Sequence, residues 1–259
     1  MERLRAEMER LRAEIAYGQR IQAHAERIWG WHSPAGRRRA ERRAALLSEH
    51  AGLERVAATL EVGCGVGVFT EMLAARARNL TAIDISPDLV ERARQRVRRE
   101  HVRFDVMNVE QTTFLPETFD AVVGSSILHH LDVGAALAEF WRILRPGGRL
   151  AFSEPNMVNP LVFLLKNVGF LKRWYGDLPH ETAFVRWSIA REVASRGFGR
   201  VRVVPYDFLV PVTPRVLVPL AARAAVLLER TPLLREVTGS LLILAEKPGV
   251  RQPGPPVCG

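Results

Sequence analysis

The chain has 259 residues, of which 47% are apolar and 25% charged, with 19 glycines, 16 prolines and two cysteines. This composition is typical of a globular protein and argues against a disordered tail or a disulfide-rich scaffold. Cys64 and Cys258 belong to no CxxC or Cys/His cluster, so we expect no metal site. The sequence has neither the apolar core of a signal peptide nor a run of roughly 20 apolar residues, which predicts a cytoplasmic protein.

The formal net charge of +9 comes almost entirely from arginine, because lysine occurs only at 166, 172 and 247. The arginines are interleaved with Glu or Ala, as in ERARQRVRRE and GRRRAERRAAL. Pairing on helix surfaces explains this pattern as well as nucleic-acid binding does. Net charge reports non-specific attraction rather than a site, so we do not expect nucleic acid to be the physiological partner.

Residues 1–52 are expected to form a helical extension. The hexad ERLRAE occurs twice and places Leu4, Met8, Leu11 and Ile15 on one stripe, which Gly18 interrupts. Two heptads are too few to define a coiled coil, so a dimer seam and a helix packed on its own domain both stay open. A second, basic helix is expected from Pro34 to about His50, after the aromatic cluster of Trp29, Trp31 and His32.

From residue 53 to 247, short apolar runs that end in Gly, Asp or Asn alternate with helical stretches. The runs are VAATLEVG, NLTAID, HVRFDV, FDAVVGSS, GRLAFSEP, RVRVVPYDF and SLLILAEK. Helices are expected near 67–78, 87–99, 133–144 and 188–197. Such alternation predicts βαβ units around a parallel sheet, that is, an α/β, doubly wound, seven-stranded Rossmann-like fold. Ligands of such sheets bind beyond the carboxyl ends of the strands.

Two stretches are too long for simple connections, residues 156–187 and 211–239. Both contain helical apolar patterns, so we expect two insertions that form a lid on the acceptor side of a site. Residues 248–259 are rich in Pro and Gly and are expected to form a loose tail.

The first strand leads into a glycine loop, LEVGCGVG. Glycines at 63, 65 and 67 let the backbone turn sharply and approach a ligand closely. A carboxylate at Glu61 would repel the pyrophosphate of a dinucleotide but attract the ammonium and sulfonium of S-adenosylmethionine. The loop therefore favours that cofactor over NAD.

Two further strand ends carry polar residues of the right kind. Asp84 ends the second strand, 21 residues after Gly63, where a carboxylate accepts hydrogen bonds from both ribose hydroxyls. Asn108 follows the third strand, and its amide is suited to an adenine edge, although Asp105 and Glu110 lie close in sequence.

The residues resemble the class I S-adenosylmethionine-dependent methyltransferases, in particular the branch that acts on sugars, natural products and quinones. The resemblance rests on LEVGCGVG, AIDIS, FDAVVGSSILHHL and RILRPGGRLAFSEPN, in the family's order between about residues 55 and 156. It implies that Glu61 and the three loop glycines hold the methionine end, Asp84 the ribose and Asn108 the adenine. Many relatives have Asp in place of Asn108. Cofactor contacts are also expected for the neighbouring positions Cys64, Ile85, Val109 and Ser125.

Candidate catalytic residues follow the fourth and fifth strands. His129 or His130, in the neutral form, is suited to take a proton from a hydroxyl acceptor. Glu154 ends the fifth strand and is placed to orient the imidazole. In similar sugar O-methyltransferases a His-His pair and an acid at this strand end are the implied catalytic groups. His180, in the first insertion, is a third candidate base.

The insertions carry Phe163, Phe170, Trp174, Tyr175, Leu217 and Leu220, which suits an acceptor with a large apolar part. Lys166, Lys172 and Arg173 beside them also permit peripheral membrane contact. We therefore expect methyl transfer to a small molecule, at a hydroxyl of a sugar or natural product. The alternatives are carbon methylation of a quinone-like or isoprenoid acceptor and, less favoured, an RNA methyltransferase or binding protein.

Overall fold

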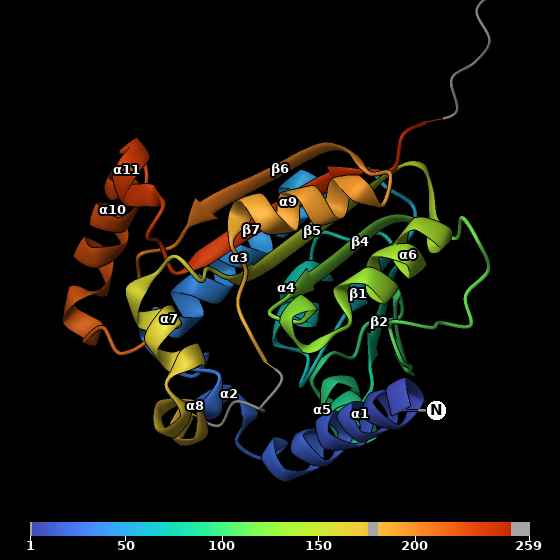
Figure 1. Ribbon diagram of the computed structural model, residues 1–259, viewed down its shortest axis with the longest axis horizontal. Helices are drawn as coiled ribbons and strands as arrows, with labels where there is room; N and C mark the ends of the chain where they lie inside the picture. The colour runs from blue at the N-terminus through green and yellow to red at the C-terminus, as the bar shows by residue number, and fades with distance from the viewer. Residues whose placement is uncertain (1, 176–180, 250–259) are drawn as a thin grey trace, which may run out of the picture.

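The computed structural model describes residues 2–175 and 181–249, and their side chains apart from those of 2–4, 6 and 173–175. Figure 1 shows one sheet with helices on both faces. The strands are β1 (Thr59–Val62), β2 (Leu80–Asp84), β3 (Val102–Val106), β4 (Phe119–Ser125), β5 (Leu144–Pro155), β6 (Gly199–Tyr206) and β7 (Ser240–Glu246). The helices are α1 (Glu2–Ile21), α2 (Ala25–Ile28), α3 (Pro34–Ala51), α4 (Val68–Leu73), α5 (Pro87–Arg96), η1 (Leu128–His130), α6 (Val133–Ile143), α7 (Pro160–Asn167), α8 (Gly169–Tyr175), α9 (Arg186–Ser195), η2 (Arg215–Leu217), α10 (Val218–Leu228) and α11 (Pro232–Arg235).

The seven strands have the order β3-β2-β1-β4-β5-β7-β6. This confirms the predicted doubly wound, seven-stranded sheet, with one difference: β7 runs antiparallel to both β5 and β6. The reason lies in the connection between β6 and β7. The N–H of Gly239 donates to the carbonyl of Asp207 at 2.9 Å, so this connection starts and ends at the same edge of the sheet. A strand that enters the sheet at the edge where the previous strand left it must run antiparallel to that strand.

Two apolar cores lie on opposite faces of the sheet. Helices α3, α4 and α5 contribute Leu47, Phe69 and Val90 to one core, and α6 and α9 contribute Phe140 and Ile189 to the other. Because both faces are covered, β1 is buried along its whole length, as a central parallel strand is expected to be. The packing leaves the carboxyl edge of the sheet as the place for a site.

Helix α1 lies on the protein's own domain, beside α5 (Figure 1). It continues through Gly18, and this glycine allows the close approach. A Cβ at position 18 would lie 2.4 Å from Ser86 Oγ, at the start of α5. Basic helix α3 forms as predicted. Ser33 caps its first turn by accepting from the N–H of Gly36 at 2.9 Å, and Gly52 ends it with a left-handed φ of 72°.

The two insertions contain helices as predicted. The first holds α7 and α8, and Asn159 caps α7 by accepting from the N–H groups of Leu161 and Val162. The second holds η2, α10 and α11, and its residue Val218 packs against Ala35 of α3 together with Leu209, which precedes the insertion. No helix in the described ranges is long and apolar enough to cross a bilayer. The candidate base His180 and residues 250–259 of the expected tail lie outside the described part of the chain.

Candidate active site

A cavity of about 320 Å³ lies at the carboxyl edge of the sheet. The register brings several strand ends together there: Val62 of β1 pairs with Ile83 of β2 and Gly124 of β4, and Pro155 of β5 pairs with Ser240 of β7. Of the expected site residues, the cavity is lined by Gly63, Cys64, Gly65, Asp84, Ile85, Asn108, Val109, Ser125, His129 and His130. Glu61, Gly67 and Glu154 are buried behind this lining.

The glycine loop is shaped for close approach of a ligand. Gly63 and Gly65 have φ of 69° and 52°, a region that residues with a Cβ rarely adopt. A Cβ at Gly63 would lie 2.6 Å from the Ile127 side chain, and one at Gly65 would lie 3.0 Å from Trp29. Gly67 has a packing role instead. A Cβ at this position would lie 3.0 Å from the Ala93 backbone, so the glycine allows α4 to pack on α5.

Glu61 is a buried carboxyl beneath the loop. The residue is only 2% exposed, and its Oε2 atom has no hydrogen-bond partner among the described residues. Burial raises the pKa of Glu61 to about 8, and the neighbouring Asp84 charge adds to the effect, while the Thr70 hydroxyl lowers it. A buried carboxyl of this kind favours a positively charged ligand nearby, because such a ligand stabilises its ionised form.

Asp84 is the last residue of β2, and Asn108 follows the end of β3. Asp84 Oδ2 accepts from the N–H of Gly65 at 2.9 Å and Oδ1 accepts from the N–H of Ser86 at 3.0 Å. Burial raises the pKa of Asp84, and these two amides oppose the rise. Asn108 Oδ1 accepts from the N–H of Glu110 at 3.0 Å, which fixes the orientation of its side chain.

His129 and Glu154 form a buried pair. His129 Nδ1 donates to Glu154 Oε2 at 2.7 Å, and Glu154 Oε1 accepts from the N–H groups of Ile127 and Leu128, both at 2.9 Å. Burial lowers the pKa of His129, as does the neighbouring His130, while Glu154 opposes the change. Burial alone would raise the pKa of Glu154, but the bond and charge of His129 and the two amides lower it. Above its lowered pKa the His129 imidazole is neutral, and because the ionised Glu154 carboxylate can only accept, the remaining proton stays on Nδ1.

His130 has different partners. Its Nδ1 lies 3.1 Å from Glu14 Oε1 and 3.8 Å from Glu181 Oε1. Burial lowers the pKa of His130, but these two carboxylates outweigh it and leave the pKa raised. His129, His130 and Glu181 place possible metal ligands within 4.8 Å of one another. Lys166 Nζ already lies 3.0 Å from Glu181 Oε2, and its positive charge disfavours a metal ion there.

Several cavity residues carry no signal in the sequence. Glu14 comes from α1, and Arg10 on the same helix donates to the carbonyl of His130 at 2.9 Å. Arg43, on α3, is 3% exposed and donates to the hydroxyls of Ser125 and Ser126 at 3.0 and 2.9 Å, and also to Ser240. The run GRRRAERRAAL gives no signal that this arginine, among several, turns inward.

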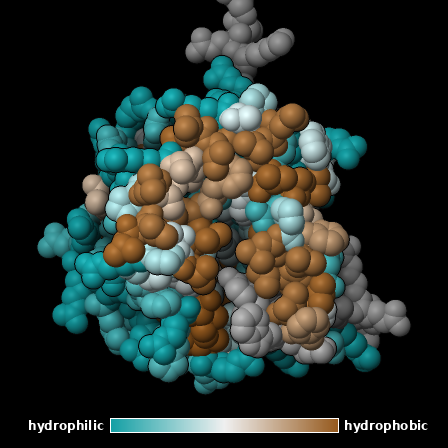
Figure 2. All heavy atoms as spheres, turned by 90° about the vertical axis from the view of Figure 1, so that its left-hand side faces the viewer, coloured by the Kyte–Doolittle hydropathy of each residue, from teal (hydrophilic) through white to brown (hydrophobic). Residues whose placement is uncertain are grey.

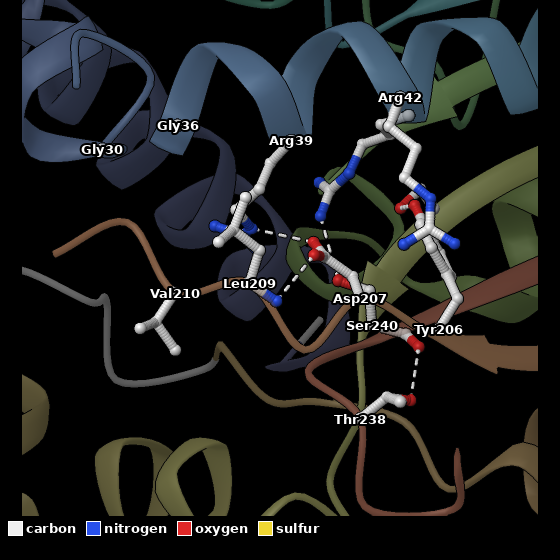
Figure 3. A network of polar contacts seen from close by, with 12 residues as sticks. Gly30, Gly36, Arg39, Arg42, Tyr206, Asp207, Leu209, Val210, Thr238 and Ser240 are labelled. Atoms are coloured by element: carbon white, nitrogen blue, oxygen red, sulfur yellow. Dashed lines mark hydrogen bonds and ion pairs between the residues drawn. The ribbon is translucent and has the colours of Figure 1, made fainter. Parts of the chain in front are cut away.

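A network of polar contacts holds α3 in place above the end of β6. Figure 3 shows Arg39 reaching from α3 to Asp207, where its Nε donates to Oδ2 at 2.8 Å. Arg42 forms two hydrogen bonds with the Glu229 carboxylate. These contacts position Arg43 over the cavity, with its guanidinium 5.1 Å from the centroid of the Trp31 ring.

Comparisons with known proteins agree with this geometry. A family model described as a methyltransferase domain matches residues 60–152. An uncharacterised methyltransferase of Mycobacterium tuberculosis is 36% identical over 138 residues, which cover 49% of this chain and 68% of that protein. The chain belongs to the class I S-adenosylmethionine-dependent methyltransferases.

Two nodulation proteins are also similar to this methyltransferase, one in sequence and one in structure. Nodulation protein S of Rhizobium tropici is 36% identical over 109 residues, which span 40% of the chain and about half, 45%, of that protein. The N-methyltransferase NodS of Bradyrhizobium japonicum, solved with S-adenosyl-L-homocysteine, superposes with a TM-score of 0.63 at 21% identity. The superposition covers 91% of this chain and 98% of that one, and it shows that the two share a fold.

The residues of the methyltransferase fit S-adenosylmethionine, the family's methyl donor. The orphaned oxygen of Glu61 suits the positive charges of its methionine end. The loop glycines offer backbone without side chains, and Asp84 offers carboxylate oxygens at the lining of the cavity. The expected cofactor residues are therefore brought to one place by four strand ends.

Proposed function

We propose that this methyltransferase transfers a methyl group to a hydroxyl of a small-molecule acceptor and that His129 is the general base. The observation that carries the proposal is the hydrogen bond from His129 Nδ1 to Glu154. With its proton on Nδ1, the imidazole has Nε2 as its proton-accepting nitrogen, and His129 lines the cavity. Glu154 fixes the tautomer and stabilises the cation that forms when Nε2 takes a proton.

The donor site is assigned to the β1, β2 and β3 ends. Backbone of the Gly63–Gly65 loop and the Glu61 carboxylate would hold the methionine end, Asp84 the ribose and Asn108 the adenine. When bound, S-adenosylmethionine supplies a methyl group activated by its sulfonium. The protein then has to hold the acceptor within about 3–3.5 Å of that carbon and take its proton.

The His129–Glu154 pair favours a hydroxyl acceptor over an amine. A neutral amine attacks without losing a proton first, whereas a hydroxyl is a weak nucleophile until a base removes its proton. An acidic carbon of a quinone-like or isoprenoid acceptor is the alternative that the same base would serve. The apolar lining supplied by Val162 and Leu165 of α7 suits the apolar part of either acceptor.

His130 is proposed to position the acceptor rather than act as the base. The carboxylates of Glu14 and Glu181 favour its protonated form, and a protonated imidazole cannot accept a proton. It also links α1 to the cavity, since Arg10 and Glu14 both contact it.

The test combines turnover with donor binding. A library of hydroxylated sugars, phenols, quinols and amines is screened with methyl-labelled S-adenosylmethionine, and the best acceptor is used for kinetics. His129→Ala should lower kcat by about 10²–10⁴, the usual contribution of a general base, and leave the Kd for S-adenosylhomocysteine within about twofold. Full turnover by His129→Ala would show that His129 is not the base. If the wild type bound neither S-adenosylmethionine nor S-adenosylhomocysteine, the proposed methyl transfer itself would be wrong.

A further inference from the structure

The two insertions carry an unusual number of exposed apolar side chains. On the first, Phe163 is 50% and Phe170 65% exposed; on the second, Val216, Leu220 and Leu233 are 86%, 69% and 85% exposed. Figure 2 shows apolar side chains gathered on one face of the molecule, in two groups with a hollow between them. Helices α7 and α8 and helices α10 and α11 lie on this side in Figure 1. We call the exposed surface of these four helices and of η2 the insertion face.

The insertion face is also short of negative charge. Residues 156–175 contain no Asp or Glu, and residues 208–228 contain none either. Glu229 follows α10 and is paired with Arg42, and Glu236 follows α11 and is paired with Arg186. Arg215 and Arg223 in this second stretch, and Arg230 just after it, are exposed. Helices that present exposed apolar side chains and arginine and contain no Asp or Glu within their described bounds are complementary to a layer of anionic phospholipid headgroups above hydrocarbon.

The insertion face is connected to the cavity through α7. One side of this helix contributes Val162, Leu165 and Lys166 to the cavity lining, while Leu161, Phe163 and Leu164 are exposed on the other side. A helix of two turns therefore separates the outer apolar surface from the proposed acceptor site. An acceptor with a long apolar part has a short path from one to the other.

We propose that the insertion face docks this enzyme onto an anionic phospholipid surface, from which an acceptor with a large apolar part enters the cavity. The acceptor half of this statement rests on the proposed function; the docking half does not. Exposed apolar patches of this kind mark interaction sites rather than ordinary surface. A second copy of the chain fits the face less well, because a symmetric contact would set its arginines against one another.

The docking experiment uses the full chain and vesicles of two compositions, phosphatidylcholine alone and phosphatidylcholine with 30 mol% phosphatidylglycerol. In flotation assays the wild type should partition at least tenfold more strongly onto the anionic vesicles, and 0.5 M salt should weaken that binding. The double variant Val216→Asp/Leu220→Asp should lose at least tenfold in partitioning, since it places two carboxylates on the face. These side chains are exposed, so the fold should tolerate the change.

Leu115→Asp is the matched control, because Leu115 is 76% exposed but lies outside both insertions; it should bind vesicles like the wild type. Sedimentation velocity is run on the same samples. No association with either vesicle, or equal association of all variants, would overturn the proposal. A dimer that the double variant dissociates would show that a second copy covers the face instead. Binding of S-adenosylhomocysteine is measured in parallel by calorimetry. If the protein binds S-adenosylhomocysteine but not vesicles, the docking proposal fails while the proposed function stands.

Discussion

Glu61 has an energetic cost in the unliganded protein that the donor is expected to offset. Its pKa is about 8 in the folded chain because of burial, against an ordinary value of 4.5. A carboxyl whose folded pKa is raised favours the folded state in its protonated form, so the free energy of unfolding falls as pH rises from about 4.5 towards 8. At pH 8 the loss is on the order of 3–5 kcal/mol.

Glu61→Gln should therefore stabilise the unliganded protein and weaken its function. At pH 8 we expect the variant to unfold at a higher temperature than the wild type, and at pH 5 the difference should nearly disappear. Calorimetric titration at pH 7 should show that the wild type releases close to one proton on binding S-adenosylmethionine, whereas the variant releases none and binds at least tenfold more weakly. A variant that binds the donor as tightly as the wild type would show that this carboxylate does not recognise it.

Glu154→Gln tests the orientation of His129 without changing the size of either side chain. The amide oxygen of Gln can still accept from the N–H groups of Ile127 and Leu128, but its NH₂ group then faces His129 Nδ1 and favours the wrong tautomer. We expect kcat to fall at least 10²-fold with an unchanged Kd for S-adenosylhomocysteine. A purely structural role for Glu154 would instead lower the melting temperature and impair donor binding as well.

The pH profile of the wild type follows from the direction of the His129 shift. Burial and the charge of His130 place the pKa of His129 below 6.5, so the neutral, active form persists at lower pH than for an ordinary histidine. The value of kcat should rise with pH, with the midpoint of the rise below pH 6.5. A single acid limb centred above pH 7 would point to a different base, because it would report a group with a raised pKa.

At the scale of elements, α1 lines one side of the cavity. It packs against α5 through Gly18 and reaches His130 through Arg10 and Glu14. Gly18→Val places atoms where a Cβ alone would lie 2.4 Å from Ser86 Oγ, so α1 must move away from α5. We expect a tenfold or greater loss of S-adenosylhomocysteine affinity with little change in the circular dichroism spectrum. Ala16→Val, at an exposed position of the same helix, is the control and should bind normally.

The sequence predicts elements well where local pattern and tertiary role agree. All seven strands and the helices α3, α5, α6 and α9 appear close to the expected bounds, because apolar runs and capping residues mark them locally. The direction of β7 was not predictable in this way. Helix α10 has the composition of a crossover helix, and the return of the chain to the edge it left is seen in tertiary contacts, such as the pairing of Tyr206 with Ser240 and the hydrogen bond between Gly239 and Asp207.

The same distinction applies to the candidate site. Residues at strand ends, such as Asp84 and His129, are predictable because parallel strands deliver their carboxyl ends to one edge. Glu14 and Arg43 are not, because they belong to helices whose charge pattern looks like ordinary solvated surface. Their inward orientation depends on how α1 and α3 dock, and docking is a tertiary property that spacing along the chain does not encode.

At the scale of the whole molecule, the cavity joins parts of the chain that are far apart in sequence. Its lining draws on α1, the ends of β1, β2 and β4, the residues that follow β3, and α7. A ligand bound there contacts many elements at once and binds only the folded chain, so it should stabilise the whole fold. At a ligand concentration of 100 Kd the gain is about 2.7 kcal/mol.

For a chain of this size that gain corresponds to a rise in melting temperature of roughly 5–11 °C. We expect S-adenosylhomocysteine to produce such a rise in a thermal-shift titration, with the midpoint increasing steadily with the logarithm of ligand concentration. NADH is the discriminating control, because its pyrophosphate would approach the loop above the Glu61 carboxylate and be repelled by it once ionised. The cavity is assigned to a cationic donor because of the charge of Glu61. Stabilisation by NADH and none by S-adenosylhomocysteine would therefore show that Glu61 does not select such a donor.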